Sequence, residues 1–479
     1  MDMEKRYAVK LGYAPTRRNV FSREDSLKYK KLIKKQLEEW GIEVVDIEGV
    51  NKEGLLYGPA DVPKIVERFR KAGVEAVFAP HCNFGTEDAV AKLAKAMGKP
   101  FLLWGPRDEA PVADGTRLRD TQCGLFATSK ILRRFGVPFT YITNSRVDDP
   151  VFERGVRNFM AAAAVVKEFR SMRIGQIAPR PDGFWTVKCN EGELLERFGI
   201  EVVSRTLVDL ASASLDKVKK KDKKLADTIK DIKKRVNTKA ISAAELARMA
   251  AMKLSMQEFV DSECLSGLAV QCWTAMQEAL GVMPCFTHSE LTGEGVPVAC
   301  ETDIHGAVSA VMLQAARLGR TPTFFADLTI RHPENENSEL LWHCGPFPSK
   351  LAADDVEPAI GRHYILDPPY PGVCDWRIKG GDVTITRFDG DFGEYSLLMG
   401  HAAGCAGPFN RGTYLWVEVG NWPMWEERII RGPYIHHVAC IHGSVAPVLY
   451  EACRYIPGLT PDPVEPTESE LQAWLRNQD

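Results

Sequence analysis

The stretch Val74-Glu-Ala-Val-Phe-Ala-Pro80 decides the fold of the first part of the chain. It is a short and almost wholly apolar run, and the segment 86–97 that follows it reads as a helix. A run of this kind is typical of a strand that is buried on both faces of a parallel sheet. The same alternation extends in both directions along the chain, so we predict a parallel sheet covered by helices on both faces.

The neighbouring segments repeat this unit. The segment Asp61–Ala72 opens with an acidic N-cap and carries Pro63 in its first turn, as helices often do. The other predicted strands are Tyr7–Tyr13, Ile42–Ile47, Pro100–Trp104 and Pro138–Thr143, and the other predicted helices include Glu24–Trp40 and Asp149–Phe169. Five such units suit a flavodoxin-like domain, which we assign to residues 1–171.

The alternation then restarts, which predicts a second α/β domain over residues 172–350. Asn190 opens a helix and Gly199 ends it. A long region, Ser214–Glu278, is predicted to be largely helical because it is rich in strong helix formers. The predicted strands are Met172–Ile177, Ile200–Ser204, Val296–Cys300 and Thr323–Ile330, with a helix over His305–Leu318.

From about Ala352 the sequence pattern changes from alternating strands and helices to turns and half-buried strands. Pro368–Gly372 and Lys379–Asp382 are turn signals, and Asp382–Arg387 and Tyr414–Val419 alternate apolar with polar residues. We therefore predict two consecutive flavodoxin-like or Rossmann-like parallel-sheet domains, followed by a mainly antiparallel β domain over residues 351–479.

Composition limits the classes of function. The chain has 479 residues, which predicts two or three domains, and a net charge of −3, which gives no global field for binding nucleic acid. No apolar stretch approaches the ~20 residues that span a bilayer, and no signal peptide is recognisable. The 12 cysteines form no CxxC pairs, which argues against a zinc ribbon or a disulfide framework. We expect a cytoplasmic protein that binds neither membrane nor nucleic acid.

Three segments carry polar groups at the ends of predicted strands. Val298–His305 ends an apolar run with Glu301, Thr323–His332 contains Asp327 within an apolar strand, and Gly432–His442 holds the pair His436-His437. An unpaired carboxylate in an apolar strand is costly to bury, so Asp327 needs a partner. Two carboxylates with one or two imidazoles make an open site for Mn²⁺ or Mg²⁺.

Each of these residues also has a structural interpretation. Glu301 could be a carboxylate favoured by a helix N-terminus, and Asp327 could belong to a buried salt bridge. The two neighbouring histidines could be one packed and one exposed side chain, and His343 could be a core histidine.

Two regions, Ser266–Pro346 and Gly412–Cys453, resemble the L-fucose isomerase / L-arabinose isomerase family. The first has an apolar segment ending in Glu301, then one ending in Phe-Ala-Asp327, and the second has a His-His pair after a Gly-Pro turn. The order of the domains is similar as well, whereas the N-terminal domain matches only loosely. The resemblance implies a metal-dependent aldose–ketose isomerase that uses Mn²⁺, with Mg²⁺ or Co²⁺ as the other candidates.

The resemblance also implies roles for single residues. Glu301 and Asp327 would be both metal ligands and the catalytic acid/base pair, and His437 the histidine ligand, with His436 one residue away in register. Arabinose-type members use a histidine at the position of His343 and fucose-type members do without it, so its role stays open.

Substrate contacts are implied from Gln271, from His436, and from Arg17 and Arg18, whose loop in the family reaches a neighbouring subunit's site. The other interpretation of the two arginines is exposed loop residues. Trp422 is a candidate for the sugar pocket, as are Trp185, Trp273, Trp416 and Trp425. The family implies a homo-oligomer, a hexamer built from trimers.

The expected substrate is a free pentose or 6-deoxyhexose of the L-fucose, D-arabinose or L-arabinose type, converted through an enediol. Two rival functions remain. The first is a sugar-binding protein without catalysis, because two consecutive α/β domains are also the layout of periplasmic sugar receptors. The second is another metal enzyme of sugar chemistry, such as an epimerase.

Overall fold

A computed structural model describes residues 3–272 and 274–476. The chain divides into two compact units. The N-terminal unit holds residues 7–167, with 450–456 and the chain from 469 onward, and the larger unit holds most of the remainder. Each unit is described by itself.

The N-terminal unit is built on a five-stranded parallel sheet of order β2-β1-β3-β4-β5, the flavodoxin-like order that the sequence predicts. Its strands are β1 (Leu11–Tyr13), β2 (Val44–Asp46), β3 (Ala76–Phe78), β4 (Phe101–Leu103) and β5 (Thr140–Tyr141). The strands are shorter than predicted, because only these residues form ladder pairs.

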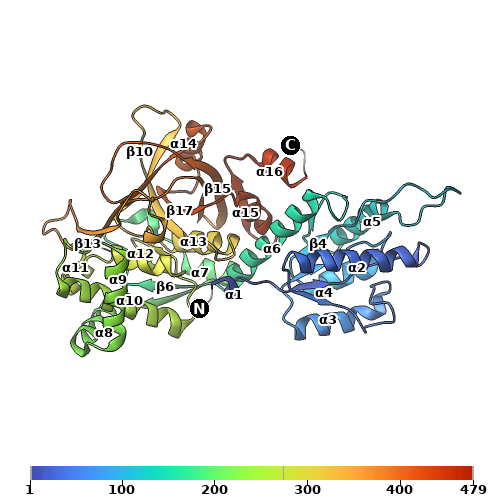
Figure 1. The fold of residues 1–479 in the computed structure, drawn as a ribbon, viewed down its shortest axis with the longest axis horizontal. Coiled ribbons are helices and arrows are strands. Elements are labelled where there is room, and N and C mark those ends of the chain that lie inside the picture. The colour runs from blue at the N-terminus through green and yellow to red at the C-terminus, as the bar shows by residue number, and fades with distance from the viewer. Residues whose placement is uncertain (1–2, 273, 477–479) are drawn as a thin grey trace. The chain divides into compact units, whose positions relative to one another are not determined.

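Helices surround this sheet, as Figure 1 shows for α2, α3, α4 and α5 around β4. Their bounds are α2 (Arg23–Glu39), α3 (Val62–Lys71), α4 (Glu87–Met97), α5 (Thr121–Arg134) and α6 (Pro150–Arg170), with a 3-10 turn, η1 (Pro59–Asp61). Ser22 caps α2 by accepting a hydrogen bond from the backbone N–H of Asp25, and Gly98 ends α4 in the left-handed region. Asp61, the predicted acidic N-cap, does precede α3, but its side chain makes no capping hydrogen bond.

The larger unit contains a second parallel sheet, of order β7-β6-β8-β9. Its strands are β6 (Arg173–Ile177), β7 (Glu201–Arg205), β8 (Gly267–Val270) and β9 (Val298–Ala299). Its helices are α1 (Met3–Arg6), α7 (Glu191–Glu193), α8 (Leu207–Lys220), α9 (Lys223–Arg235), α10 (Ala243–Glu263), α11 (Ala275–Leu280), α12 (Cys285–Gly293) and α13 (Ile304–Ala316), with short turns η2 (Trp185–Val187), η3 (Leu194–Phe198) and η4 (Ser349–Leu351).

The predicted long helical region over Ser214–Glu278 is wrong at its end, because β8 interrupts it. Cys264 ends α10 in the left-handed region, with φ of 53°. The next apolar run, Gly267–Val270, then enters the sheet between β6 and β9. A four-residue apolar run cannot be told from a buried helical turn by periodicity alone, which explains the error.

The last part is a nine-stranded, mainly antiparallel sheet, of order β12-β13-β16-β11-β10-β17-β14-β15-β18. Its strands are β10 (Thr323–Arg331), β11 (Ser338–His343), β12 (Ala359–Arg362), β13 (Pro371–Arg377), β14 (Asp382–Asp391), β15 (Glu394–Gly404), β16 (Thr413–Glu418), β17 (His437–His442) and β18 (Leu459–Pro463), with the helix α14 (Trp422–Arg431). The end of α15 (Ala446–Cys453) and nearly all of α16 (Glu468–Leu475) belong to the N-terminal unit. An additional pairing of β15 with β16 closes the sheet into a barrel.

The first strand of the barrel therefore begins at Thr323. The sequence pattern instead predicts that the β-rich domain begins near residue 351. The reason is that β10 begins with four buried residues, Thr323 to Ala326, and so resembles a parallel-sheet strand. One hydrophobic core runs from the parallel sheet into the barrel and includes Leu268, Phe324 and Val438. No helix among residues 3–272 and 274–476 is long and apolar enough to cross a membrane.

Candidate metal centre

Four side chains named from the sequence converge in the larger unit. Glu301 lies two residues beyond β9, Asp327 lies within β10, His343 ends β11 and His437 begins β17. Asp327 and His437 are direct partners in the β10–β17 ladder, so their side chains share a face of the barrel wall. Three neighbouring strands and the end of a parallel strand thus meet at one point.

The ligand atoms of these residues face one another at short range. Nε2 of His343 lies 3.6 Å from Oε2 of Glu301 and 3.9 Å from Oδ1 of Asp327. Nε2 of His437 lies 3.8 Å from Oε2 of Glu301 and 3.5 Å from Oδ1 of Asp327. These spacings are those of atoms that surround a common centre rather than atoms joined by direct hydrogen bonds.

The backbone at Glu301 is held in an unusual conformation. Both Glu301 and Thr302 have positive φ values, 54° and 58°, which cost side-chain-bearing residues of order 1–3 kcal/mol each. Hydrogen bonds hold Thr302 there, from its backbone N–H to the carbonyl of Val270 at 3.1 Å and from its hydroxyl to the carbonyl of Pro179 at 3.2 Å. The bend turns the Glu301 carboxylate toward the cluster.

A series of buried charged side chains begins at Nδ1 of His437. Its Nδ1 lies 3.0 Å from Oδ2 of Asp303, the N-cap of α13, which also accepts the backbone N–H of Gly306 at 2.9 Å. Arg387 on β14 donates to both oxygens of Asp303 and, at 2.8 Å, to Asp389. An imidazole whose Nδ1 is held by a carboxylate presents Nε2 in a fixed direction, which is how metal-binding histidines are usually oriented.

The charges of the cluster shift the acidity of its members. Burial raises the pKa of Glu301, but His343 and His437 outweigh it and bring the pKa to about 2. Burial also raises the pKa of Asp303, yet Arg387 and His437 hold it well below its usual value. Glu301 and Asp303 therefore stay ionised at neutral pH.

The pKa values of the other three members of the cluster are raised. Burial raises the pKa of Asp327 above its usual value, since the opposing effect of the two histidines is smaller. Burial lowers the pKa of both His343 and His437, but neighbouring carboxylates outweigh it and raise both pKa values above 6.5. The cluster therefore attracts positive charge.

The residues fit a hard divalent cation. Oδ1 of Asp327 and Nε2 of His343 are buried and have no hydrogen-bond partner within the described part of the chain. Such groups are costly unless something else satisfies them. Two carboxylate and two imidazole donors are the set that Mn²⁺ or Mg²⁺ accepts, with positions left over for substrate oxygens.

His436 belongs to the same neighbourhood. Its ring centroid lies 4.2 Å from that of His437, and one ligand atom each of Asp327, His436 and His437 lie within 4.8 Å of one another. Partial burial of the imidazole and the neighbouring His437 lower the pKa of His436 to about 4, which keeps the imidazole neutral. His436 is exposed, unlike His437, so it stands on the open side of the cluster.

The predicted substrate residues lie in different places. Gln271 follows β8, and the thiol of the next residue, Cys272, donates to Oε1 of Glu301 at 3.1 Å. Trp422 begins α14 and is buried in the main hydrophobic core, as is Trp425. Trp273 lies outside the described residues. Substrate contact by Gln271 and Trp422 stays a prediction.

Arg17 and Arg18 lie in the N-terminal unit, in the loop after β1. Nε of Arg17 donates to Glu53 at 2.6 Å, and Nε of Arg18 donates to the carbonyl of Gly85 at 3.0 Å. Arg17 is buried, so the interpretation of both residues as exposed loop arginines does not hold for it. Their predicted reach into a neighbouring subunit's site stays a prediction.

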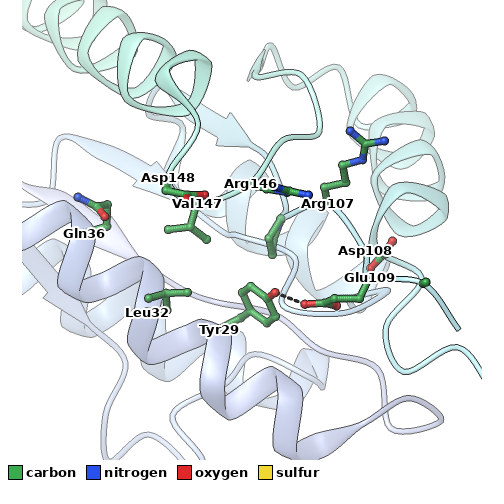
Figure 2. Close-up of a pocket in the computed structure, with 11 residues that line it drawn as sticks. Tyr29, Leu32, Gln36, Arg107, Asp108, Glu109, Arg146, Val147 and Asp148 are labelled. Atoms are coloured by element: carbon green, nitrogen blue, oxygen red, sulfur yellow. Dashed lines mark hydrogen bonds between the residues drawn. The ribbon is translucent and has the colours of Figure 1, made fainter. Parts of the chain in front are cut away.

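The N-terminal unit also has a pocket of about 670 Å³ between α2 and the loops after β4 and β5. Figure 2 shows the Tyr29 hydroxyl pointing at Glu109, to which it donates a hydrogen bond. Arg119 in turn donates to Glu109 at 2.8 Å. These polar groups satisfy one another and none of the four metal-ligating candidates lines the pocket, so we place the chemistry in the larger unit.

The sequence marks Asp303 only as one of three potential ligands in Val298–His305, and it assigns no role to Arg387 and Asp389. A signal was present, because an arginine at a buried position of the strand Asp382–Asp391 requires a carboxylate partner. That one of its partners is Asp303 depends on the packing of α13 against β14, which the sequence does not reveal.

Comparisons with known proteins show which families this chain is similar to. Residues 12–170 match the model of the fucose/sulfoquinovose isomerase N-terminal domain. A sulfoquinovose isomerase of Priestia aryabhattai is 27% identical over 80% of this chain and 84% of its own length. Another, of Alkalicoccus urumqiensis, is 28% identical over 79% of this chain and 84% of its own length.

Among solved structures, a periplasmic solute-binding protein of Actinobacillus succinogenes with bound D-allose covers 64% of this chain and 92% of its own. It is 12% identical, and its TM-score of 0.17 is too low to support the sugar-receptor alternative. The match of the N-terminal domain and the two relatives agree with each other, and together they support a fucose isomerase-like family for this chain.

Proposed function

We propose that this protein is a metal-dependent aldose–ketose isomerase. The observation that carries the proposal is the convergence of Glu301, Asp327, His343 and His437, whose ligand atoms lie 3.5 to 3.9 Å apart across the cluster. The similarity to sulfoquinovose isomerases over about four-fifths of the chain supports the same reaction class.

The reaction requires removal of a weakly acidic proton from the carbon next to a carbonyl group. When bound by these four residues, a divalent cation supplies a Lewis acid that stabilises negative charge on two neighbouring substrate oxygens. We propose Mn²⁺ as the ion, with Mg²⁺ and Co²⁺ as alternatives.

The protein's own groups carry out the proton transfers. Glu301 and Asp327 divide them: one carboxylate moves the proton from C2 to C1, and the other moves the hydroxyl proton between O2 and O1. Asp303 holds Nδ1 of His437, so the imidazole keeps its direction while the carboxylates exchange protons. His436, neutral and on the open side, is placed to donate a hydrogen bond to a substrate hydroxyl.

The first substrate we propose is a free hexose that is altered at C6. The family model and the relatives name two such sugars, sulfoquinovose, which carries a sulfonate at C6, and fucose, which lacks the hydroxyl there. The relatives that cover most of the chain are sulfoquinovose isomerases, so we place sulfoquinovose first and a 6-deoxyhexose or pentose second. We further propose a cytoplasmic homo-oligomer, a hexamer or trimer, as the family resemblance implies.

The test is a panel of aldoses incubated with protein that has been stripped of metal and reloaded with Mn²⁺, with ketose formation followed by NMR. The proposal expects conversion of at least one C6-altered aldose and, in deuterated water, deuterium at C1 or C2 of the product. An epimerase would instead yield a second aldose. Ketose without any solvent deuterium would exclude the enediol route in favour of a hydride shift.

A matched pair of variants tests the assignment of the residues. Glu301→Gln keeps the size of the side chain but removes its charge, and it should abolish turnover while circular dichroism shows an intact fold. Glu339→Gln makes the same change of side chain at a buried glutamate of β11 outside the cluster, where burial raises the pKa to about 7, and it should retain activity. Full activity of Glu301→Gln would contradict the mechanism.

A further inference from the structure

Two cysteines meet beside the metal centre. Sγ of Cys285, the first residue of α12, lies 3.2 Å from Sγ of Cys344, the residue directly after β11. Cys285 is fully buried, whereas Cys344 is partly exposed. The pair therefore joins a residue of the core to a residue at the edge of the core.

The backbone holds this pair together by an unusually close approach. A Cβ on Gly345 would lie 2.1 Å from Cβ and 2.4 Å from Cα of Cys285, so only glycine allows the chain after Cys344 to run so near α12. Met283 and Val373 pack with Cys285 and Cys344 in a small separate hydrophobic cluster. The contact between the sulfurs is thus built into the local packing and does not depend on a flexible side chain.

The pair is connected directly to one of the metal-ligating candidates. Nδ1 of His343 accepts the backbone N–H of Cys344 at 2.9 Å and lies 3.4 Å from its sulfur. The other ring nitrogen, Nε2, faces Glu301 at 3.6 Å. Any movement of Cys344 is therefore transmitted to the ring that faces the cation site.

We propose that Cys285 and Cys344 form a peroxide-sensitive dithiol whose oxidation to a disulfide displaces His343 and weakens metal binding. The chemistry needs a hydroperoxide such as H₂O₂ as the oxidant. The sulfur of Cys344 attacks one peroxide oxygen, the O–O bond breaks, and a sulfenic acid and one water form. The sulfur of Cys285 then attacks the sulfenic sulfur, the S–O bond breaks, and a disulfide and a second water form.

The step balances, because two thiols lose two electrons and two protons and the peroxide is reduced to two waters. Formation of the S–S bond draws the sulfurs from 3.2 Å to about 2.05 Å. Since Gly345 already lies against α12, this movement must come mainly from Cys344 and the end of β11. The expected consequence is a change in the hydrogen bond and sulfur contact that orient the His343 ring.

Other cysteines of the described chain are placed differently. Cys272 and Cys300 also lie near Glu301, but both are fully buried, so neither lies at the edge of the core. Cys123 and Cys264 are exposed, yet neither has a thiol contact of the kind that joins Cys285 to Cys344. Reversible oxidation is therefore expected at one pair.

The test uses the whole protein and two readouts that do not depend on isomerase activity. The protein is titrated with H₂O₂, quenched in acid and digested without reduction, and the peptides are identified by mass spectrometry. In parallel, binding of Mn²⁺ is measured by electron paramagnetic resonance. The proposal expects a Cys285–Cys344 cross-linked peptide and, over the same range of H₂O₂, a rise of about tenfold or more in the Kd for Mn²⁺.

A variant and its control complete the design. In Cys285→Ala the sulfenic acid at Cys344 has no resolving thiol, so no cross-link should form and dithiothreitol should no longer restore Mn²⁺ binding after prolonged oxidation. Cys440→Ala removes a similarly buried thiol from β17 and should behave like the wild type.

The inference is overturned if no Cys285–Cys344 peptide appears, or if the cross-linked protein binds Mn²⁺ as tightly as the reduced one. It rests on the proposed cation site for its effect, and the two can fail separately. Reduced protein that binds no Mn²⁺ contradicts the proposed function, whereas reduced protein that binds it and never cross-links contradicts only the dithiol.

Discussion

Replacing Asp303 with Asn tests whether the buried charge chain orients His437. The variant keeps the shape of the side chain and its ability to cap α13, where the native carboxylate accepts the N–H of Gly306 at 2.9 Å. It removes the negative charge that lies 3.0 Å from Nδ1 of His437 and that pairs with Arg387. The variant therefore removes the electrostatic support of the imidazole and the ion pair with Arg387, and it keeps the cap of α13.

The expected magnitude follows from these contacts. Loss of a carboxylate that supports a metal-binding histidine costs about 10–100-fold in metal affinity, or about 1.4–2.8 kcal/mol. The cost in folding stability is smaller than for breaking an isolated buried pair, because Arg387 keeps Asp389 at 2.7 Å. We expect a loss of about 1–3 kcal/mol in the free energy of unfolding.

The assay is titration with Mn²⁺, followed by electron paramagnetic resonance, together with chemical denaturation of the metal-free protein. Asp222→Asn is the matched control, since Asp222 caps α9 in the same way through the N–H of Leu225 at 2.8 Å and lies outside the cluster. The control should bind Mn²⁺ like the wild type. If Asp303→Asn also binds Mn²⁺ with unchanged affinity, Asp303 is only a helix cap and the argument for orientation fails.

Three further substitutions separate the roles of neighbouring residues. His343→Asn should raise the Kd for Mn²⁺ at least about tenfold if the ring is a ligand, and an unchanged Kd would place this protein with the fucose-type members that do without it. His436→Ala should raise KM for the sugar while leaving the Kd for Mn²⁺ within about twofold, and a large loss of metal binding would reverse the assignment of the two histidines. Gly345→Ala should lower the free energy of unfolding by about 1–3 kcal/mol in chemical denaturation, because its Cβ would lie 2.4 Å from Cα of Cys285, and unaltered stability would show that α12 can move aside.

Much of the site could be predicted because each of its members interrupts an apolar pattern. Asp327 and His437 stand out in apolar strands, and Glu301 follows one directly. A polar group in such a position needs a partner, and the number of available partners in the sequence is small. The strand–helix alternation likewise predicts the flavodoxin-like order of the first sheet.

What could not be predicted depends on contacts between distant segments. Arg387 meets Asp303 because α13 packs against β14, and two residues that lie 84 positions apart in the sequence give no sign of this contact. The contact of Cys285 with Cys344 depends on the close approach of Gly345 to α12. The strand Gly267–Val270 was missed because four apolar residues have no period that would distinguish strand from helix.

The most direct test of the central claim is the metal dependence of ketose formation. Protein stripped of metal with a chelator and dialysed is offered sulfoquinovose and L-fucose, with and without added Mn²⁺, and the products are followed by NMR. The account predicts no conversion by the stripped protein, conversion of at least one of these sugars after Mn²⁺ is restored, and none in Glu301→Gln under either condition. Ketose formation at an equal rate with and without metal would contradict it.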